Sequence, residues 1–569
     1  MSDPIRQEGR MKSPPNEPQQ VEPGWKIWLP RILFAVVAPV LLLALGEGAL
    51  RLFNVGYPTQ LMQPEQFHGK PTSCYNLFFA APYFPPGMIK TPQYYCVDPI
   101  KQPGTYRIVI LGESAAMGDP DFAYGFGRYL EVMLRERFPS IKFELINTGM
   151  VAINSHVSLA IAKGLAEYKP DLYIVYAGSN EVVGPYGPGT VLTTSSMSLP
   201  VIRASIFVRS LRLGQLLTET GKAKTQWQGM EMFLDKKVRA DSPRLQPAYR
   251  NFESNLRDIV ATAKGAAAHV VLCTIAVNLK DSAPFGSLHR DNLTSETLQS
   301  WSVLVQQGAS REAAQDYPEA IKFYTSALRL DDQYAELHFR LARCYRANGN
   351  LTSAKEHYIR ARDLDVLRFR ADSRINDAIR TAAQSSGQET SLLDTESLFA
   401  DNSRDGIIGS EILYDHVHFT PLGNYLMAQA LFTQIVKTLP AQAIRSARGV
   451  GPLTQADCEH LLAFTALDRA RVAREMVDRL QRPPFTSQLN HMEQIQSMML
   501  RATAPTERFE DAVREYQWAI DHTPEDLTLH YKFGFSLFDY DRNAAAQQLL
   551  LARPTDNFPV FLPDGTQIR

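Results

Sequence analysis

Apolar and polar residues follow two alternating patterns through the middle of this 569-residue chain. Short apolar runs, such as residues 108–111 within YRIVILG, predict buried strands, whereas the residues after them, such as 126–138, place apolar side chains at helical spacing. The segments that continue this order of strand and helix are 142–149, 156–168, 170–180, 249–266, 268–277 and, more weakly, 390–399. Such alternation predicts right-handed crossovers and a parallel sheet, that is, an α/β domain.

A different pattern, with a period of 34 residues, interrupts this domain. The recurring pairs are Ala320 and Ala354, Tyr324 and Tyr358, Ala327 and Ala361, and Leu330 and Leu364. Toward the C-terminus the same signature returns at Ala512, Tyr516, Ala519 and Ala546. The period, with small residues where paired helices touch, resembles that of tetratricopeptide repeats (TPRs). The resemblance implies inserted all-α repeats at 297–365 and a related helical region at 453–556, which bind a protein partner or act as spacers.

The N-terminal part has the composition of a tail followed by a membrane helix. Residues 1–24 are rich in Pro, Gln and Glu and carry too little apolar surface to fold, which predicts disorder. Residues 27–46, within an apolar segment at 25–53, carry a single charge, Arg31, and have the length of a bilayer span. A single-pass anchor is the favoured interpretation, with a cleaved signal peptide and a buried soluble helix as alternatives.

The topology of such an anchor bears on the residues after it. More basic residues precede the span than follow it, which favours a cytoplasmic N-terminus and an extracytoplasmic catalytic domain, periplasmic or at the cell surface. Residues 54–104 are rich in Pro, Tyr and Phe and predict an irregular linker. Cys74 and Cys96 in this linker would face an oxidising compartment, so we expect a disulfide between them. Cys273 and Cys344 have the surroundings of small core residues.

The composition of the chain argues against several functions. Lys and Arg number 59 against 60 Asp and Glu, so the net charge of −1 gives no basic surface for nucleic acid. Five cysteines without a CxxC pair give neither a disulfide scaffold nor a zinc site. We therefore expect no metal, no cofactor and no nucleic-acid partner.

The first predicted strand ends in a sequence that suits a nucleophile. Ser114 follows it directly, within GESAAMG, although a serine at this place can also cap a helix. Far along the chain Asp415 precedes His418 by three residues, which lets a carboxylate reach an imidazole in a tight loop. His416 and His156 are alternative histidines, each more typical of a packing or surface residue. The hypothesis is a nucleophile, a base and an orienting acid.

Two further strands end in residues that could stabilise an oxyanion. Gly149 follows the second strand and Asn180 follows the third. Because the carboxyl ends of parallel strands share one edge, both residues should converge on Ser114. The backbone N–H groups of Ser114 and Gly149 and the side-chain amide of Asn180 would then form the oxyanion hole.

Taken together, these motifs resemble those of SGNH hydrolases of the GDSL esterase/lipase superfamily. The blocks GESAAMG, NTG, GSNE and DHVH occur in the family's order over residues 105–285 and 366–440. The resemblance implies a flavodoxin-like three-layer α/β fold with a parallel sheet. It also implies that Ser114 is the nucleophile, His418 the base and Asp415 its partner.

Two positions depart from the family's pattern. Glu113 and Glu181 stand where the family usually has Asp; both keep the carboxylate and lengthen the side chain by one methylene, which puts loop geometry and substrate class in question.

The hydrolase domain is expected in two parts, 105–296 and 366–440. The first repeat block, 297–364, should overhang the mouth of the active site, because the strand before it ends at the catalytic edge.

The favoured function is a membrane-anchored serine ester hydrolase that acts through an acyl-enzyme on an unidentified ester, with the repeats for partner binding or access control. One alternative is an O-acyltransferase or deacetylase on a cell-envelope glycan, since a sugar hydroxyl could replace water. Another alternative is a catalytically inactive TPR scaffold, against which the presence of all five catalytic positions counts.

Overall fold

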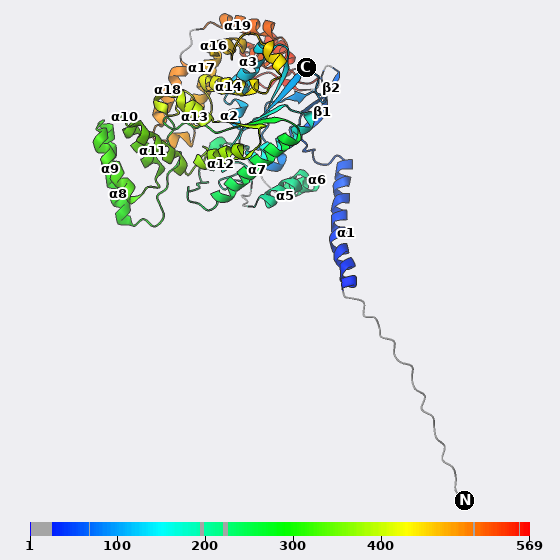
Figure 1. The fold of residues 1–569 in the computed structure, drawn as a ribbon, viewed down its shortest axis with the longest axis horizontal. Coiled ribbons are helices and arrows are strands. Elements are labelled where there is room, and N and C mark those ends of the chain that lie inside the picture. Colours follow the sequence, from blue (N-terminus) through cyan, green and yellow to red (C-terminus); the bar gives the residue numbers. More distant parts are fainter. Residues whose placement is uncertain are drawn as a thin grey trace. The chain divides into compact units, whose positions relative to one another are not determined.

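The computed structural model describes most of the chain (Figure 1). The described residues are 1, 25–67, 69–193, 198–219, 226–503, 507–556 and 558–568. The predicted tail at 1–24 therefore lies outside the described residues, except for Met1. The chain divides into two units, formed by residues 1–57 with 211–220 and by residues 58–210 with 221–569.

The smaller unit contains helices α1 (Trp25–Leu52) and α6 (Arg212–Glu219). The part of α1 from Phe34 to Leu52 has a mean hydropathy of 1.8, and none of it is buried. Glu47 joins the two helices, because its carboxylate accepts the backbone N–H of Leu213 at 3.1 Å. By length and composition α1 can cross a membrane, and a signal sequence near the N-terminus would have the same features.

A five-stranded parallel sheet forms the centre of the larger unit, with strand order β5-β4-β6-β7-β8. The strands are β4 (Thr105–Gly112), β5 (Lys142–Asn147), β6 (Leu172–Tyr176), β7 (His269–Cys273) and β8 (Thr390–Leu393). Every residue of β4 and β6 is buried, as continuous apolar runs require when helices cover both faces of a sheet. The predicted parallel α/β fold is confirmed.

Helices cover the sheet in two groups. The first group is α3 (Phe126–Arg137) with α14 (Pro421–Val436), and the second is α4 (Ser155–Leu165), α7 (Leu245–Gly265) and α12 (Ser373–Ser385). The chain moves one way along the sheet from β4 to β5 and the other way through β6, β7 and β8. Right-handed crossovers therefore place α3 and the second group on opposite faces, which gives three layers.

The inserted repeats form two antiparallel helix pairs. Their helices are α8 (Ser295–Ala313), α9 (Tyr317–Leu330), α10 (Ala335–Ala347) and α11 (Leu351–Leu364). The repeated small and aromatic residues of α9 and α11 are buried, as the 34-residue period predicts. Gly308 lets α8 approach α9 closely, because a Cβ at this position would lie 2.5 Å from the ring of Tyr324.

A helical region follows the sheet domain and packs on it. Its helices are α15 (Ala441–Arg445), α16 (Gln455–Leu461), α17 (Ala466–Leu480), α18 (His491–Ala502), α19 (Phe509–His522), α20 (Leu527–Leu537) and α21 (Arg542–Leu551). A short hairpin, β9 (Val560–Phe561) with β10 (Gln567–Ile568), follows them. The hydroxyl of Tyr516 in α19 forms a hydrogen bond of 2.9 Å with the hydroxyl of Tyr124, and Tyr124 follows Ser114 closely in sequence. This region is therefore attached near the carboxyl edge of the sheet.

The segment expected to be an irregular linker contains a small antiparallel sheet, which corrects that prediction. Its strands are β1 (Met62–Phe67), β2 (Lys70–Tyr75) and β3 (Cys96–Val97). The register places Cys74 opposite Cys96, and the two form a disulfide with an S–S distance of 2.00 Å. These strands were hidden because β1 and β2 are mostly polar and each contains a proline, and because β3 has only two residues. Apart from one helix at Ser114, the remaining helices of the larger unit are α5 (Leu199–Ser210) and the short helices Ala81–Tyr83, Phe122–Tyr124, Ala166–Tyr168, Gly229–Phe233, Thr395–Asp401, Arg404–Gly406 and Phe485–Ser487.

Candidate active site

Ser114 stands at the carboxyl end of β4, where it begins the one-turn helix α2 (Ser114–Met117). Gly112 permits this turn, because a Cβ there would lie 2.3 Å from the backbone oxygen of Tyr176. As the first residue of a helix, Ser114 has a backbone N–H that no acceptor within the helix can satisfy. The sequence thus presents both the hydroxyl and the amide of Ser114 at the edge of the sheet.

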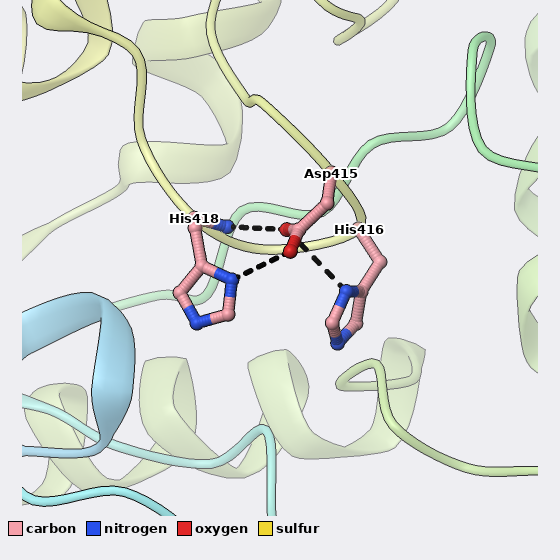
Figure 2. A group of neighbouring side chains, drawn as sticks. All are labelled: Asp415, His416 and His418. Carbon is pink, nitrogen blue, oxygen red and sulfur yellow. Dashed lines mark hydrogen bonds and ion pairs between the residues drawn. The ribbon is translucent and has the colours of Figure 1, made fainter. Parts of the chain in front are cut away.

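Asp415 and His418 lie together on a loop before α14 (Figure 2). The loop is closed by a bridge between Leu413 and Phe419. His418 Nδ1 lies 2.7 Å from Asp415 Oδ2, and His418 Nε2 lies 2.9 Å from Ser114 Oγ. The structure therefore brings the three predicted residues into one hydrogen-bonded chain.

Burial and neighbouring charges change the pKa values of His418 and Asp415 in opposite directions. Burial would lower the pKa of His418, but Asp415 and Asp119 beside it raise this pKa to about 9. Burial would raise the pKa of Asp415, but His418 and His416 hold it well below its usual range. Asp415 is fully buried, and an ionised carboxylate at such a place needs a cationic partner.

His416 occupies the other side of Asp415, as Figure 2 shows, with its Nδ1 3.3 Å from Asp415 Oδ1. The ligand atoms of Asp415, His416 and His418 lie within 4.8 Å of one another, close enough to surround a metal ion. The carboxylate of Asp415 and the imidazole of His418 also take part in the hydrogen bonds that lead to Ser114, so these two side chains already have partners. His416 itself packs edge-on against Phe285 and Phe485. His156, the other alternative histidine, bonds to Asn255 at 3.0 Å and lies outside the pocket lining among the described residues.

The two glutamates that depart from the family's pattern hold the loops around Ser114. Glu113 accepts backbone N–H groups from Gly178 at 3.0 Å, Ser179 at 2.8 Å and Asn180 at 3.3 Å. Glu181 accepts the backbone N–H and the hydroxyl of Ser155 at 2.7 and 2.8 Å. Burial raises the pKa of Glu113 to about 8 and that of Glu181 to about 7, against these hydrogen bonds.

Asn180 lines the pocket beside Ser114, but Gly149 takes a different place from the one expected. Its N–H donates to Asn147 Oδ1 at 3.0 Å, and a Cβ at Gly149 would lie 2.3 Å from the backbone nitrogen of Met117. Gly149 thus permits close packing against α2. Among the described residues, the pocket lining reaches Ala152 and omits Gly149.

Ala152 was not singled out by the sequence analysis. Its φ is 61°, a backbone conformation that non-glycine residues rarely adopt and that is frequent at functional sites. No motif in the sequence shows this conformation, because alanine has no special preference for it. Its position three residues after Gly149 is the one clue that the sequence offers.

The pocket in front of Ser114 has a volume of about 550 Å³. The apolar part of the lining consists of Trp227, Met230, Phe233, Phe369 and Phe485. The end of α17 and the residues after it form a charged rim with Glu475, Asp478, Arg479 and Arg482.

The inserted repeats do not overhang this pocket, so the expectation for residues 297–364 is wrong. No residue of that block belongs to the lining among the described residues, and the C-terminal helical region takes that place. Strand β7 does end at the catalytic edge, but about twenty residues of irregular chain separate it from α8. Helices α8 to α10 form a hydrophobic core of their own around Trp301 and Tyr324, and not around the pocket.

Two more residues touch the catalytic chain and were missed from the sequence. Asp119 Oδ2 lies 2.9 Å from His418 Nε2. Arg479 of α17 binds both oxygens of Asp119, at 2.7 and 2.9 Å, and its Nη1 lies 3.3 Å from His418 Nδ1. Asp119 closes the serine block in sequence, whereas Arg479 is one of several arginines on an amphipathic helix.

Fold and site together define an α/β protein with a serine–histidine–aspartate chain at the carboxyl edge of a parallel sheet. A family model for the tetratricopeptide repeat matches residues 312–368. No curated protein matches the sequence.

Among solved structures the chain is similar to two acetylxylan esterases. One is AlAXEase, at 10% identity over 58% of this chain and 99% of that one, with a TM-score of 0.27. The other is a catalytic mutant of Axe2 from Geobacillus stearothermophilus, at 11% identity over 58% and 94% of the chains, with a TM-score of 0.27. The TPR2AB domain of yeast Sti1 matches at 13% identity over 45% and 91%, with a TM-score of 0.12. These likenesses are distant.

Proposed function

We propose that this protein is a serine ester hydrolase that acts through an acyl-enzyme. The observation that carries the proposal is the hydrogen-bonded chain in which His418 stands 2.9 Å from Ser114 Oγ and 2.7 Å from Asp415 Oδ2. This geometry lets an imidazole take the serine proton while a buried carboxylate fixes its tautomer and supports its charge.

In the proposed reaction Ser114 Oγ attacks the ester carbonyl and His418 takes the hydroxyl proton. The backbone N–H groups of Ser114 and Ala152 and the side-chain amide of Asn180 receive the negative charge of the tetrahedral intermediate. His418 then gives its proton to the leaving alcohol. A water molecule, deprotonated by His418, hydrolyses the acyl-Ser114 ester and restores the enzyme.

The proposal includes membrane attachment through α1, with the N-terminus in the cytoplasm and the catalytic unit outside it. The apolar segment Phe34–Leu52 and the excess of basic residues before it support this topology. The tetratricopeptide helices would bind a protein partner, which is the usual role of such repeats. The substrate is an ester whose acyl or alcohol part fits an apolar pocket of about 550 Å³.

A fluorophosphonate probe tests the central claim, because it reacts with activated serines. Full-length protein in detergent should be labelled at Ser114 and should cleave p-nitrophenyl esters of some chain length. Ser114→Ala should abolish both signals, and the control Ser446→Ala, at an exposed serine, should keep both. Equal labelling of wild type and Ser114→Ala would exclude Ser114 as the nucleophile. Product analysis with and without a polyol acceptor distinguishes hydrolysis from acyl transfer.

A further inference from the structure

Two oxygen atoms compete for the same nitrogen of His418. Nε2 lies 2.9 Å from Ser114 Oγ and also 2.9 Å from Asp119 Oδ2. In a neutral imidazole whose Nδ1–H donates to Asp415, Nε2 carries a lone pair and acts only as an acceptor. A hydroxyl can donate to that lone pair, but an ionised carboxylate cannot. The contact with Asp119 therefore requires a proton on Nε2.

Arg479 keeps Asp119 ionised, and an ionised Asp119 can contact His418 Nε2 only when Nε2 carries a proton. Its two terminal nitrogens bind the two oxygens of Asp119 at 2.7 and 2.9 Å, the bidentate arrangement that suits arginine and a carboxylate. Burial would raise the pKa of Asp119, but His418 and Arg479 hold it well below its usual range. The side chain of Asp119 is 15% exposed, so water screens the pair little.

We infer that Asp119, held by Arg479 of the C-terminal helical region, is a positioning residue that fixes the protonation state of His418. The inference rests on the proposed function, because it concerns the base of that same site. Asp119 holds His418 as an imidazolium in the resting protein and supports the imidazolium that forms when the base takes the serine proton. His418 becomes a base only when it loses the Nε2 proton and its contact with Asp119.

The charges that surround His418 support a titration above neutral pH. The charged or titratable groups that face it are Asp415 and His416 from its own loop, Asp119 from the loop after α2, and Arg479 from α17. Glu475 stands behind Arg479 at 3.3 Å. Two carboxylates against one guanidinium leave a net attraction for the imidazolium, in line with the pKa of about 9.

The pH dependence of kcat/KM for a p-nitrophenyl ester tests the inference in the full-length protein. Since the base is the deprotonated form, wild-type activity should rise through neutral pH with an apparent pKa near 9. Asp119→Asn removes one negative charge at 2.9 Å from Nε2, which typically changes a pKa by about one to three units. The acid limb should move to lower pH by at least about one unit, and the high-pH plateau of kcat/KM should fall, because Asp119 no longer supports the imidazolium of the transition state.

Two further variants separate this role from a structural one. Arg479→Lys keeps a positive charge beside Asp119, so the acid limb of its pH profile of kcat/KM should match that of the wild type. Asp121→Asn is the matched control, since Asp121 also pairs with an arginine of α17, Arg471 at 3.0 Å, yet lies outside the pocket lining among the described residues. Its acid limb should coincide with that of the wild type. An equal shift in Asp121→Asn would overturn the inference.

A direct titration of His418 by NMR separates the inference from the proposed function. The imidazole signal, assigned by its loss in His418→Gln, should titrate near pH 9 in the wild type and at least one unit lower in Asp119→Asn. A wild-type value near 6.5, or no change on substitution, would refute the role of Asp119 even in an active enzyme. A titration as expected in a protein that no fluorophosphonate labels would uphold the role and reject the hydrolase.

Discussion

Replacing Asp415 by asparagine changes one atom and should reverse the tautomer of His418. Asp415 Oδ1 accepts the backbone N–H groups of Val417 at 2.9 Å and His418 at 3.0 Å, while Oδ2 accepts from His418 Nδ1 at 2.7 Å. Two donors face the Oδ1 position, so the amide oxygen of Asp415→Asn must stay there. Its NH₂ group then faces Nδ1, which becomes an acceptor, so the neutral imidazole carries its only proton on Nε2, facing Ser114.

A His418 with this tautomer cannot accept the serine proton. The corresponding change in other serine triads lowers kcat by about 10⁴-fold, which equals about 5.4 kcal/mol of transition-state stabilisation. We expect a loss of that order for Asp415→Asn, measured as kcat on an activated ester between pH 6 and 10. The fold should survive, because both backbone hydrogen bonds remain.

Asp401→Asn is the control for this measurement, since Asp401 is an exposed acid at the end of a short helix. It should keep the wild-type kcat. Circular dichroism and thermal unfolding should show that Asp415→Asn is folded at the assay temperature. A folded Asp415→Asn protein that retains more than a tenth of wild-type kcat at every pH would refute the orientation argument.

Three further changes test the fold around the site. Cys74→Ala with Cys96→Ala opens a loop with a sequence separation of 22 and should lower the free energy of unfolding by about 3 kcal/mol in urea; a loss below 1 kcal/mol would contradict this. Gly308→Ala places a methyl group 2.5 Å from the ring of Tyr324 and should cost about 1–3 kcal/mol, while kcat stays unchanged because the repeats do not line the pocket. Ala152→Gly suits a φ of 61° and should keep the wild-type kcat, whereas Ala152→Val should lower kcat. If Ala152→Val also kept the wild-type kcat, this backbone conformation would be unimportant for activity.

The sheet and the repeats could be predicted because each follows from a local pattern. Strand β4 is buried throughout, and its residues 108–111 appear in the sequence as an apolar run. The inserted helices show a period of 34 residues that fixes their pairing. The strands of β1–β3 escaped prediction, because β3 has two residues and its pairing depends on a partner 22 positions away.

Only part of the site could be predicted in the same way. Ser114 stands at a strand end and His418 in the loop before α14, each in a recognisable block, and the structure brings them to 2.9 Å. Arg479 had no such signal, since its contact with Asp119 spans 360 positions and its helix shows only an ordinary polar face. Ala152 had none either, because the conformation that brings it to the pocket belongs to the folded loop.

The segment just after Ser114 explains how a distant helical region comes to contribute to the site. Four of its side chains each bond to that region: Asp119 to Arg479, Asp121 to Lys532, Tyr124 to Tyr516, and Arg128 to Asp526. Asp119 and Arg479 both line the pocket, so removing Arg479 would leave an uncompensated carboxylate beside Ser114, at a cost of several kcal/mol. The other three pairs attach the region to the sheet domain. The region therefore forms part of the pocket wall and the electrostatics of the site, in addition to any role in binding a partner.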